Sequence, residues 1–183
     1  MESWLDHLAS VYGDQRFRTR KQAREVKELC DEGLVLAQWM KNSPDVRSWR
    51  GRFSGPGQQA DAYVRESTSS PVINIQIVSA FDGRARAAEM VELNKSRVVT
   101  GFVGFLSQYE ADQQAIVVER IKGKTAKQYP SDYWLLVGVE DSVHGLSKMP
   151  RLVNAAKVEA SSSNFDRVYL VGAGKKNQIE RIK

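Results

Sequence analysis

Cysteine, histidine and long apolar runs are scarce in this chain of 183 residues. Its single cysteine, Cys30, excludes a disulfide within the chain and a cysteine-rich zinc site. The two histidines, His7 and His144, lie far apart in the sequence and are poor material for a zinc centre. No apolar stretch approaches the roughly 18 residues that a membrane helix needs. We therefore expect neither zinc chemistry nor a membrane partner.

The N-terminal segment lacks the layout of a secretory signal, because Glu2 and Asp6 are acidic and no basic-then-apolar stretch is present. Hydrophobic residues make up 42% of the chain and charged residues 27%, which is typical of a globular domain and argues against disorder. The length favours one hydrophobic core. We therefore expect a cytoplasmic protein with a single domain over 1–183.

Apolar periodicity predicts how this domain is organised. Segment 1–45 reads as N-terminal helices, the longer of which covers 19–41, and segment 46–183 reads as a mixed sheet with flanking helices. Strands are expected over 49–53, 60–65, 72–80, 133–139, 165–172 and 178–182, and further helices over 83–95, 110–128 and 149–160. Segment 98–106 remains open between strand, loop and helix. The pattern predicts an α/β (α+β) fold with a mixed central sheet.

Two polar residues on neighbouring predicted strands form a candidate metal site. Asp61 lies early in one strand and Gln76 lies in the next, and side chains on one face of adjacent antiparallel strands can meet. A carboxylate, an amide oxygen and the backbone carbonyl of Ile77 could together hold a hard divalent cation such as Mg²⁺. Alternatively, Gln76 bonds a neighbouring side chain or faces solvent beside Asn74.

The basic residues are clustered, although the net charge is only +5. Arginine makes bidentate contacts with phosphate, and an interleaved aromatic ring can stack on a base, so these clusters predict nucleic-acid binding. The alternative is a solvated helix face. Arg47, Arg50 and Arg52 flank Trp49 and Phe53 in one cluster. The nucleic-acid contacts predicted from all clusters are Arg16, Arg18, Arg20, Arg24, Arg50, Lys122, Lys124 and Lys127.

The segment around these sites resembles the PD-(D/E)XK nuclease superfamily. The residues that carry the resemblance are Asp61, the strand over 72–78 with Gln76, and the segment 117–137 that leads into an apolar strand. The resemblance implies a restriction-endonuclease-like core and a metal-dependent nuclease. It also implies a metal-site glutamate on the long first helix, supplied here by Glu25 or Glu28.

Two departures from the superfamily pattern bear on activity. Ala60, and not proline, precedes Asp61, and Val78 stands where the pattern has a lysine. That lysine would position or activate the attacking water. Basic residues on the following predicted helix, Arg84, Arg86 or Lys95, are candidates to replace it. Glu89 on the same helix could supply a displaced carboxylate.

The sequence thus predicts a nucleic-acid-binding protein with a nuclease-like fold, acting as a Mg²⁺-dependent endonuclease if it is an enzyme. The predicted catalytic residues are Asp61, Gln76 and Glu25, and the predicted metal ligands are Asp61, Gln76 and Ile77. DNA is favoured over RNA as the partner, and a homodimer or larger assembly remains open. The alternatives are a binding module that kept the fold and lost the chemistry, and a protein-interaction or assembly subunit.

Overall fold

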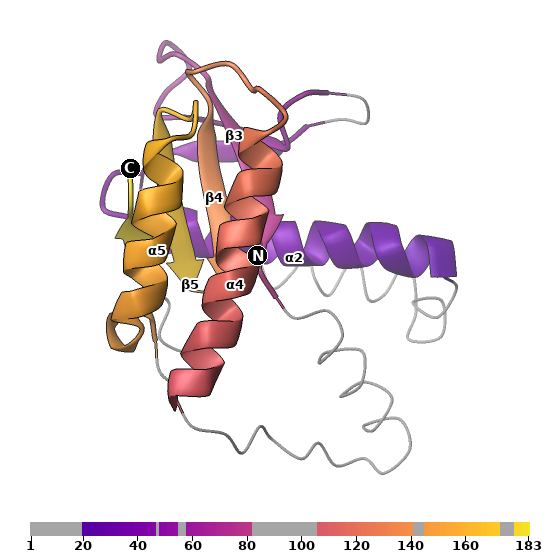
Figure 1. Ribbon diagram of the computed structural model, residues 1–183. Helices are drawn as coiled ribbons and strands as arrows, with labels where there is room; N and C mark the ends of the chain where they lie inside the picture. The colour runs from indigo at the N-terminus through magenta and orange to yellow at the C-terminus, as the bar shows by residue number, and fades with distance from the viewer. Residues whose placement is uncertain (1–19, 47, 55–57, 82–105, 141–144, 173–177) are drawn as a thin grey trace.

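The computed structural model describes residues 20–46, 48–54, 58–81, 106–140, 145–172 and 178–183. These segments form three α-helices, one short 3-10 helix and six strands, coloured along the chain in Figure 1. In chain order the elements are α2 (Arg20–Asn42), β1 (Arg50–Phe53), β2 (Ala62–Arg65), β3 (Ile73–Ser79), α4 (Leu106–Thr125), β4 (Trp134–Val139), η1 (Leu146–Lys148), α5 (Pro150–Ser161), β5 (Arg167–Gly172) and β6 (Ile179–Arg181).

All six strands belong to one mixed sheet, and their order in the sheet is their order in the chain. β1, β2 and β3 form an antiparallel meander. β3, β4 and β5 are parallel, and helices α4 and α5 provide the two crossovers. β6 returns antiparallel at the far edge. The fold is therefore α+β with a mixed sheet, as the sequence predicted.

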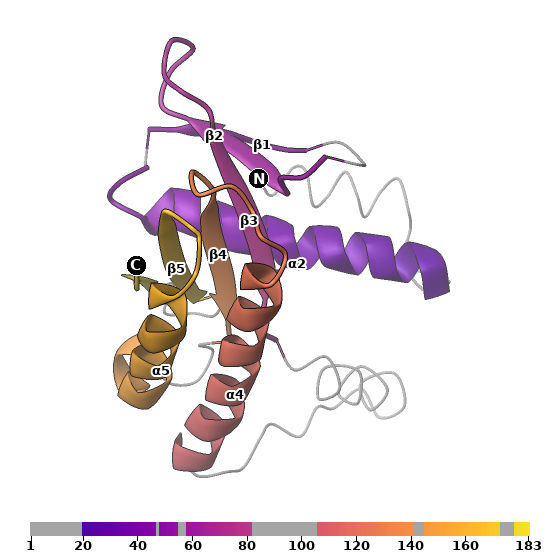
Figure 2. The same ribbon diagram turned by 45° about the horizontal axis from the view of Figure 1, so that its top comes forward.

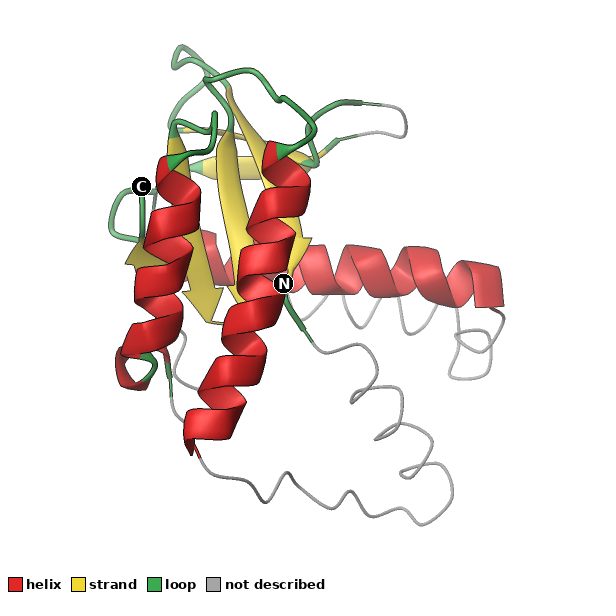
Figure 3. Ribbon diagram, viewed as in Figure 1, coloured by secondary structure: helices red, strands yellow, loops and turns green. Residues whose placement is uncertain are grey.

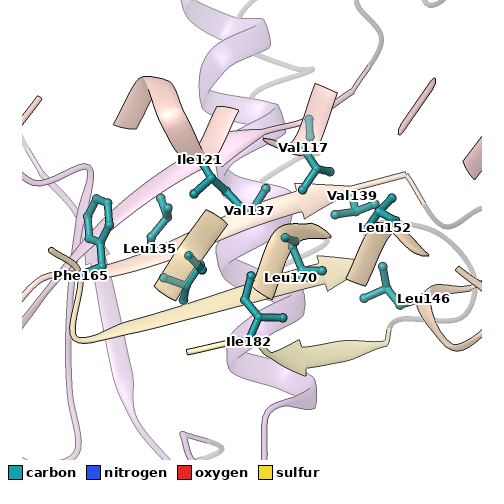
Figure 4. Packing of buried hydrophobic residues seen from close by; sticks show 14 of the residues in the cluster. Val117, Ile121, Leu135, Val137, Val139, Leu146, Leu152, Phe165, Leu170 and Ile182 are labelled. Carbon is teal, nitrogen blue, oxygen red and sulfur yellow. The ribbon is translucent and has the colours of Figure 1, made fainter. Parts of the chain in front are cut away.

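The helices cover both faces of this sheet. α4 and α5 lie side by side on one face and α2 crosses the other, as Figures 1 and 2 show and as the helix and strand colours of Figure 3 make plain. Strand alternation distributes the buried side chains between the two faces. Leu135 and Val137 of β4 pack under α4 and α5 (Figure 4), whereas Leu136 packs toward α2. β4 is buried along its whole length, which confirms the expected central strand.

One side-chain contact joins α2 to the sheet, and another joins α4 to α5. On the α2 side, Trp39 packs edge-on against Trp134, with ring centroids 6.0 Å apart. On the other side, buried Glu110 of α4 accepts hydrogen bonds from the backbone N–H groups of Arg151 (2.7 Å) and Leu152 (3.2 Å). The first turn of α5 contains no acidic residue of its own. Glu110 therefore supplies, from a neighbouring helix, the oxygen that these N–H groups need.

The predicted elements agree with the observed ones to within a few residues at most ends. The largest difference is at α4, which begins at Leu106 and ends at Thr125, against a predicted helix over 110–128. The helix ends early because Gln128 has a left-handed backbone, with φ of 52°. The predicted helix over 83–95 and the first helix of segment 1–45 lie outside the described residues. Among the described helices, none is long and apolar enough to cross a membrane.

Candidate active site

The β2–β3 pairing places Asp61 beside the middle of β3. The backbone N–H of Asp61 donates to the carbonyl of Ile75 (2.9 Å), which extends the ladder one residue beyond β2. Its carboxylate Oδ2 accepts the backbone N–H of Ile77 at 2.7 Å. Within a strand, the N–H and C=O of one residue point to the same edge. The carbonyl of Ile77 therefore faces the edge of β3 at which Asp61 lies.

Gln76 lies between these contacts and is fully buried. Its Nε2 donates to the carbonyl of Gln59 at 2.5 Å, and its Oε1 accepts from Nζ of Lys124 at 2.6 Å. A carbonyl can only accept and an ammonium can only donate, so these two partners fix the orientation of the amide. Gln76 does not face solvent. It bonds the side chain of Lys124 from α4, as in the alternative from the sequence in which Gln76 bonds a neighbouring side chain.

Lys124 joins the two polar residues. Its Nζ lies 2.9 Å from Oδ2 of Asp61 as well as 2.6 Å from Oε1 of Gln76. The Lys124 side chain is only 14% exposed, so this ammonium exchanges most of its water for protein oxygens. The sequence grouped Lys124 with Lys122 and Lys127 as a solvent-facing phosphate contact. The structure instead turns it inward, because the last turn of α4 ends above β2 and β3.

Tyrosine rings border this cluster. Nζ of Lys124 lies 5.8 Å from the ring centroid of Tyr129, and that ring stacks on Tyr133 at 5.8 Å. Burial raises the pKa of Tyr129 above its ordinary value, and the negative charge of Asp61 and then Tyr133 raise it further. Asp61 and Tyr129 are thus close enough to interact electrostatically. The neutral phenol is the favoured form beside the carboxylate.

The oxygen atoms present suit Mg²⁺, which binds proteins through one or two carboxylates and keeps several waters. Asp61 offers Oδ1, for which the described residues show no hydrogen bond. Gln76 Oε1 and the Ile77 carbonyl complete the donor set predicted from the sequence. The described residues contain no group of three or more histidine, cysteine or acidic side chains that could hold a metal. Oδ2 of Asp61 and Oε1 of Gln76 already accept from Lys124, and Mg²⁺ binding at this cluster stays a prediction.

Several predicted site residues are not brought to this cluster by the described structure. Arg20, Arg24, Glu25 and Glu28 lie on α2, where the structure describes only their backbone, and α2 packs on the face of the sheet opposite Gln76. The role of Glu25 stays a prediction. Outside the described residues lie Arg16, Arg18, Arg84, Arg86, Glu89 and Lys95.

The remaining predicted phosphate contacts lie on the surface. Arg50 is exposed on β1, and Lys127 is exposed just after α4. Lys122 is exposed on α4 and lies 3.7 Å from Glu159 of α5. Surface exposure leaves all three able to meet an anion, and Arg50 alone of the three lies on the sheet, where it pairs with Arg65 of β2.

The aromatic residues of the β1 cluster were expected to stack on bases, and their placement differs from that expectation. Trp49 packs against Trp134, with ring centroids 6.0 Å apart, and both Trp49 and Phe53 pack against the core on the α2 side. Alternation along β1 explains this, since Phe53 points to one face while Arg50 and Arg52 point to the other. The aromatic ring beside these arginines is Tyr63, which lies under Arg52 at 5.4 Å.

Sequence reasoning missed Lys124 as a member of the site. The available signal was topological. A helix that connects two parallel strands runs back across them, so the last turn of α4 must return to the end of the sheet at which β3 begins. Lys122 and Lys124 lie in that last turn and were therefore the lysines expected to approach Asp61.

Comparison with known proteins adds no assignment, since the chain matches no family model, no curated protein and no solved structure.

Proposed function

We propose that this chain binds nucleic acid and hydrolyses a phosphodiester bond at the cluster of Asp61, Gln76 and Lys124, with Mg²⁺ as cofactor. The observation that carries the proposal is the position of Lys124, whose ammonium contacts both polar residues. The sequence lacks a lysine two residues after Gln76, and we assign the role of that lysine to Lys124, which contacts Gln76 from α4. The order of elements, with a helix, a three-stranded antiparallel meander, a helix and a parallel strand, supports the expected restriction-endonuclease-like core.

The chain's own groups have separate tasks in this reaction. Asp61, Gln76 and the Ile77 carbonyl would hold the cation, which lowers the pKa of a bound water and offsets phosphate charge. Lys124 has three N–H donors, of which Asp61 and Gln76 occupy two. The third is left for a phosphate oxygen. A fixed cation at that point stabilises negative charge as it builds up on the phosphate.

The bond changes are those of hydrolysis. The water oxygen forms a bond to phosphorus, and the bond between phosphorus and one bridging ester oxygen breaks. The attacking water gives up a proton to solvent, and the leaving oxygen takes one from solvent. Lys124 donates to Asp61 and Gln76, and it acts on the phosphate by orientation and charge.

The test is cleavage of plasmid DNA, single-stranded DNA and RNA with Mg²⁺ or Mn²⁺. We expect Asp61→Ala and Lys124→Met to lower the cleavage rate by about 10²–10³-fold, the typical effect of removing one preorganised charge-stabilising group. Lys157→Met, at an exposed lysine of α5 that pairs with Glu180, is the matched control and should cleave like wild type. Metal-dependent cleavage that survives Asp61→Ala would show that the site lies elsewhere.

One observation favours a second candidate, a binding module without chemistry. Asp61 is the only carboxylate at the cluster among the described residues, and it is already neutralised by Lys124. In that case the ion pair only stabilises the fold. Nucleic-acid binding would then be sensitive to salt and independent of metal. Calorimetry would detect no saturable Mn²⁺ binding to the wild type. Mn²⁺ binding that is lost in Gln76→Ala would contradict this candidate.

A further inference from the structure

The face of the sheet that contains Asp61 continues into a pocket lined by arginines. Along β2, Ala62 and Val64 are buried toward α2, so Asp61, Tyr63 and Arg65 share the opposite face. That is the face from which Lys124 reaches Asp61 and Gln76. The open part of the sheet beyond α4 is thus the surface next to the candidate active site.

The strand register brings three arginines together on this face. Arg50 of β1 pairs directly with Arg65 of β2, and Arg52 pairs with Tyr63. Residues directly opposite in an antiparallel pair extend to the same side of the sheet. With Tyr63 and Val72, they line a surface pocket of about 230 Å³, which we call the arginine pocket.

The arginine pocket has an unbalanced positive charge. Among the described residues, no carboxylate lies within ion-pair distance of Arg50, Arg52 or Arg65. Like charges directly opposite each other on paired strands are unfavourable, and an anion bound between Arg50 and Arg65 removes that cost. The pocket is smaller than the roughly 300–1,000 Å³ that small-molecule ligands occupy, and its size suits a single phosphate group.

We propose that the arginine pocket binds a backbone phosphate of duplex DNA on the strand whose phosphodiester lies at Asp61. This inference rests on the proposed function for its placement of the substrate. Arg50 and Arg65 contact the phosphate oxygens, because guanidinium forks match that geometry. Arg52 is held over Tyr63 and completes the positive wall.

The distance along β2 gives the spacing of this contact. Asp61 and Arg65 are four residues apart in extended backbone, which is roughly 13–14 Å. Phosphates along one strand of B-form DNA advance about 3.4 Å per nucleotide along the axis and also wind around it, so neighbouring phosphates lie roughly 7 Å apart in space. The arginine pocket therefore lies about two nucleotide steps from the phosphodiester at Asp61.

Binding without cleavage tests the pocket separately from the chemistry. A labelled duplex oligonucleotide is titrated with the full chain in EDTA, at several salt concentrations. We expect Arg50→Gln and Arg65→Gln each to weaken binding about tenfold and to lower the salt-dependence slope by about one. Arg151→Gln, an exposed arginine on α5, is the matched control and should bind like wild type. Both pocket variants should fold as well as wild type, because each removes a like-charge contact.

The outcomes separate the two proposals. Weaker binding in the pocket variants supports the arginine pocket even if the wild-type chain cuts no substrate. Unchanged binding in both variants overturns the pocket, and it leaves the proposed function intact if the wild type still cleaves.

A scan of duplexes that each carry one neutral methylphosphonate linkage then tests the spacing. The linkage at which Arg65→Gln no longer weakens binding should lie about two nucleotides from the linkage at which Lys124→Met no longer weakens it. A coincident pair of positions would overturn the assignment. So would saturable binding of inorganic phosphate to the pocket that the duplex does not displace.

Discussion

Oδ2 of Asp61, the residue just before β2, accepts the backbone N–H of Ile77 in β3 at 2.7 Å. The bond extends the contacts between β2 and β3 to the residue before β2. The acceptor is a side-chain oxygen, whereas the acceptors within the sheet are backbone carbonyls. The carboxylate is therefore oriented by the sheet itself. Its position does not depend on a ligand, which is what preorganisation of a charged site requires.

Replacing Lys124 should destabilise the fold as well as the chemistry. In Lys124→Met, Oε1 of Gln76 and the Asp61 carboxylate lose their shared donor in a mostly buried place. We expect the free energy of unfolding to fall by about 1–3 kcal/mol, measured by urea denaturation. Lys122→Met removes only an exposed contact with Glu159 and should change it by about 0–1 kcal/mol. Equal effects of the two substitutions would contradict the buried-donor assignment.

The pKa of Tyr129 should respond to Asp61. The pKa is raised chiefly by burial and then by the Asp61 charge, so Asp61→Asn should lower it toward its ordinary value. Ultraviolet titration of tyrosinate measures the change, and subtraction of a Tyr129→Phe titration isolates the signal. Tyr169 is the internal control, since its raised pKa has burial as the largest cause and no contribution from Asp61.

The same shift sets a pH dependence of stability. Because the folded protein favours the neutral phenol of Tyr129, this contribution is fully present below pH 10.0, the ordinary pKa of tyrosine. It is lost as pH rises from that value through the higher pKa of the folded state. Tyr129→Phe should therefore flatten the fall in melting temperature on the alkaline side. An alkaline fall as steep as that of the wild type would count against this assignment.

Two glycines should respond to alanine in opposite directions. At Gly138 of β4, an added methyl group would overlap Cγ2 of Val35 and lie 3.4 Å from Cζ of Phe81. Gly138→Ala should therefore lower the free energy of unfolding by about 1–3 kcal/mol, because α2 has to shift. At Gly123 of α4 the methyl group meets nothing within 4 Å. Gly123→Ala should raise it by about 0.5–1 kcal/mol through helix propensity, and thermal unfolding of the pair decides the sign of each.

Glu110 should matter through its oxygen rather than its charge alone. Glu110→Ala leaves two N–H groups at the start of α5 without their acceptor and should cost about 1–2 kcal/mol. Glu110→Gln keeps an acceptor oxygen and should cost less. Glu119→Ala, an exposed position on the same helix, should stay within about 0.5 kcal/mol of wild type. Denaturant midpoints give the ranking, and a Gln variant as damaged as the Ala variant would contradict it.

The sheet could be predicted from sequence because its strands carry their own signals. β3 and β4 are rich in β-branched and apolar residues between turn residues, and both lie where periodicity placed them. The pairing of Asp61 with β3 was also within reach, because hairpin neighbours in the chain are usually neighbours in a sheet. The sequence pattern was sufficient to predict strands and pairings between segments that are close together in the chain.

The contacts of Lys124 and Arg65 could not be predicted in the same way. Lys124 is separated from Asp61 by 63 positions, and a lysine among other lysines in the last turn of a helix has the pattern of a solvated residue. Arg65 stands alone in its strand and joins Arg50 only through the register of β1 and β2. Trp49 shows the reverse case, since its arginine neighbours in the chain point to the opposite face. Each of these depends on long-range geometry that composition does not encode.

The match between strand order and chain order has a consequence for how the site is assembled during synthesis. A chain leaving the ribosome N-terminus first can add each strand to an edge that already exists, without inserting one between two others. Asp61 and Gln76 are brought into register by the β2–β3 hairpin, whereas Lys124 arrives with the crossover to β4. The nascent domain thus holds the Asp61 carboxylate without its counter-charge until α4 docks. Docking of α4 is the step at which the site becomes complete.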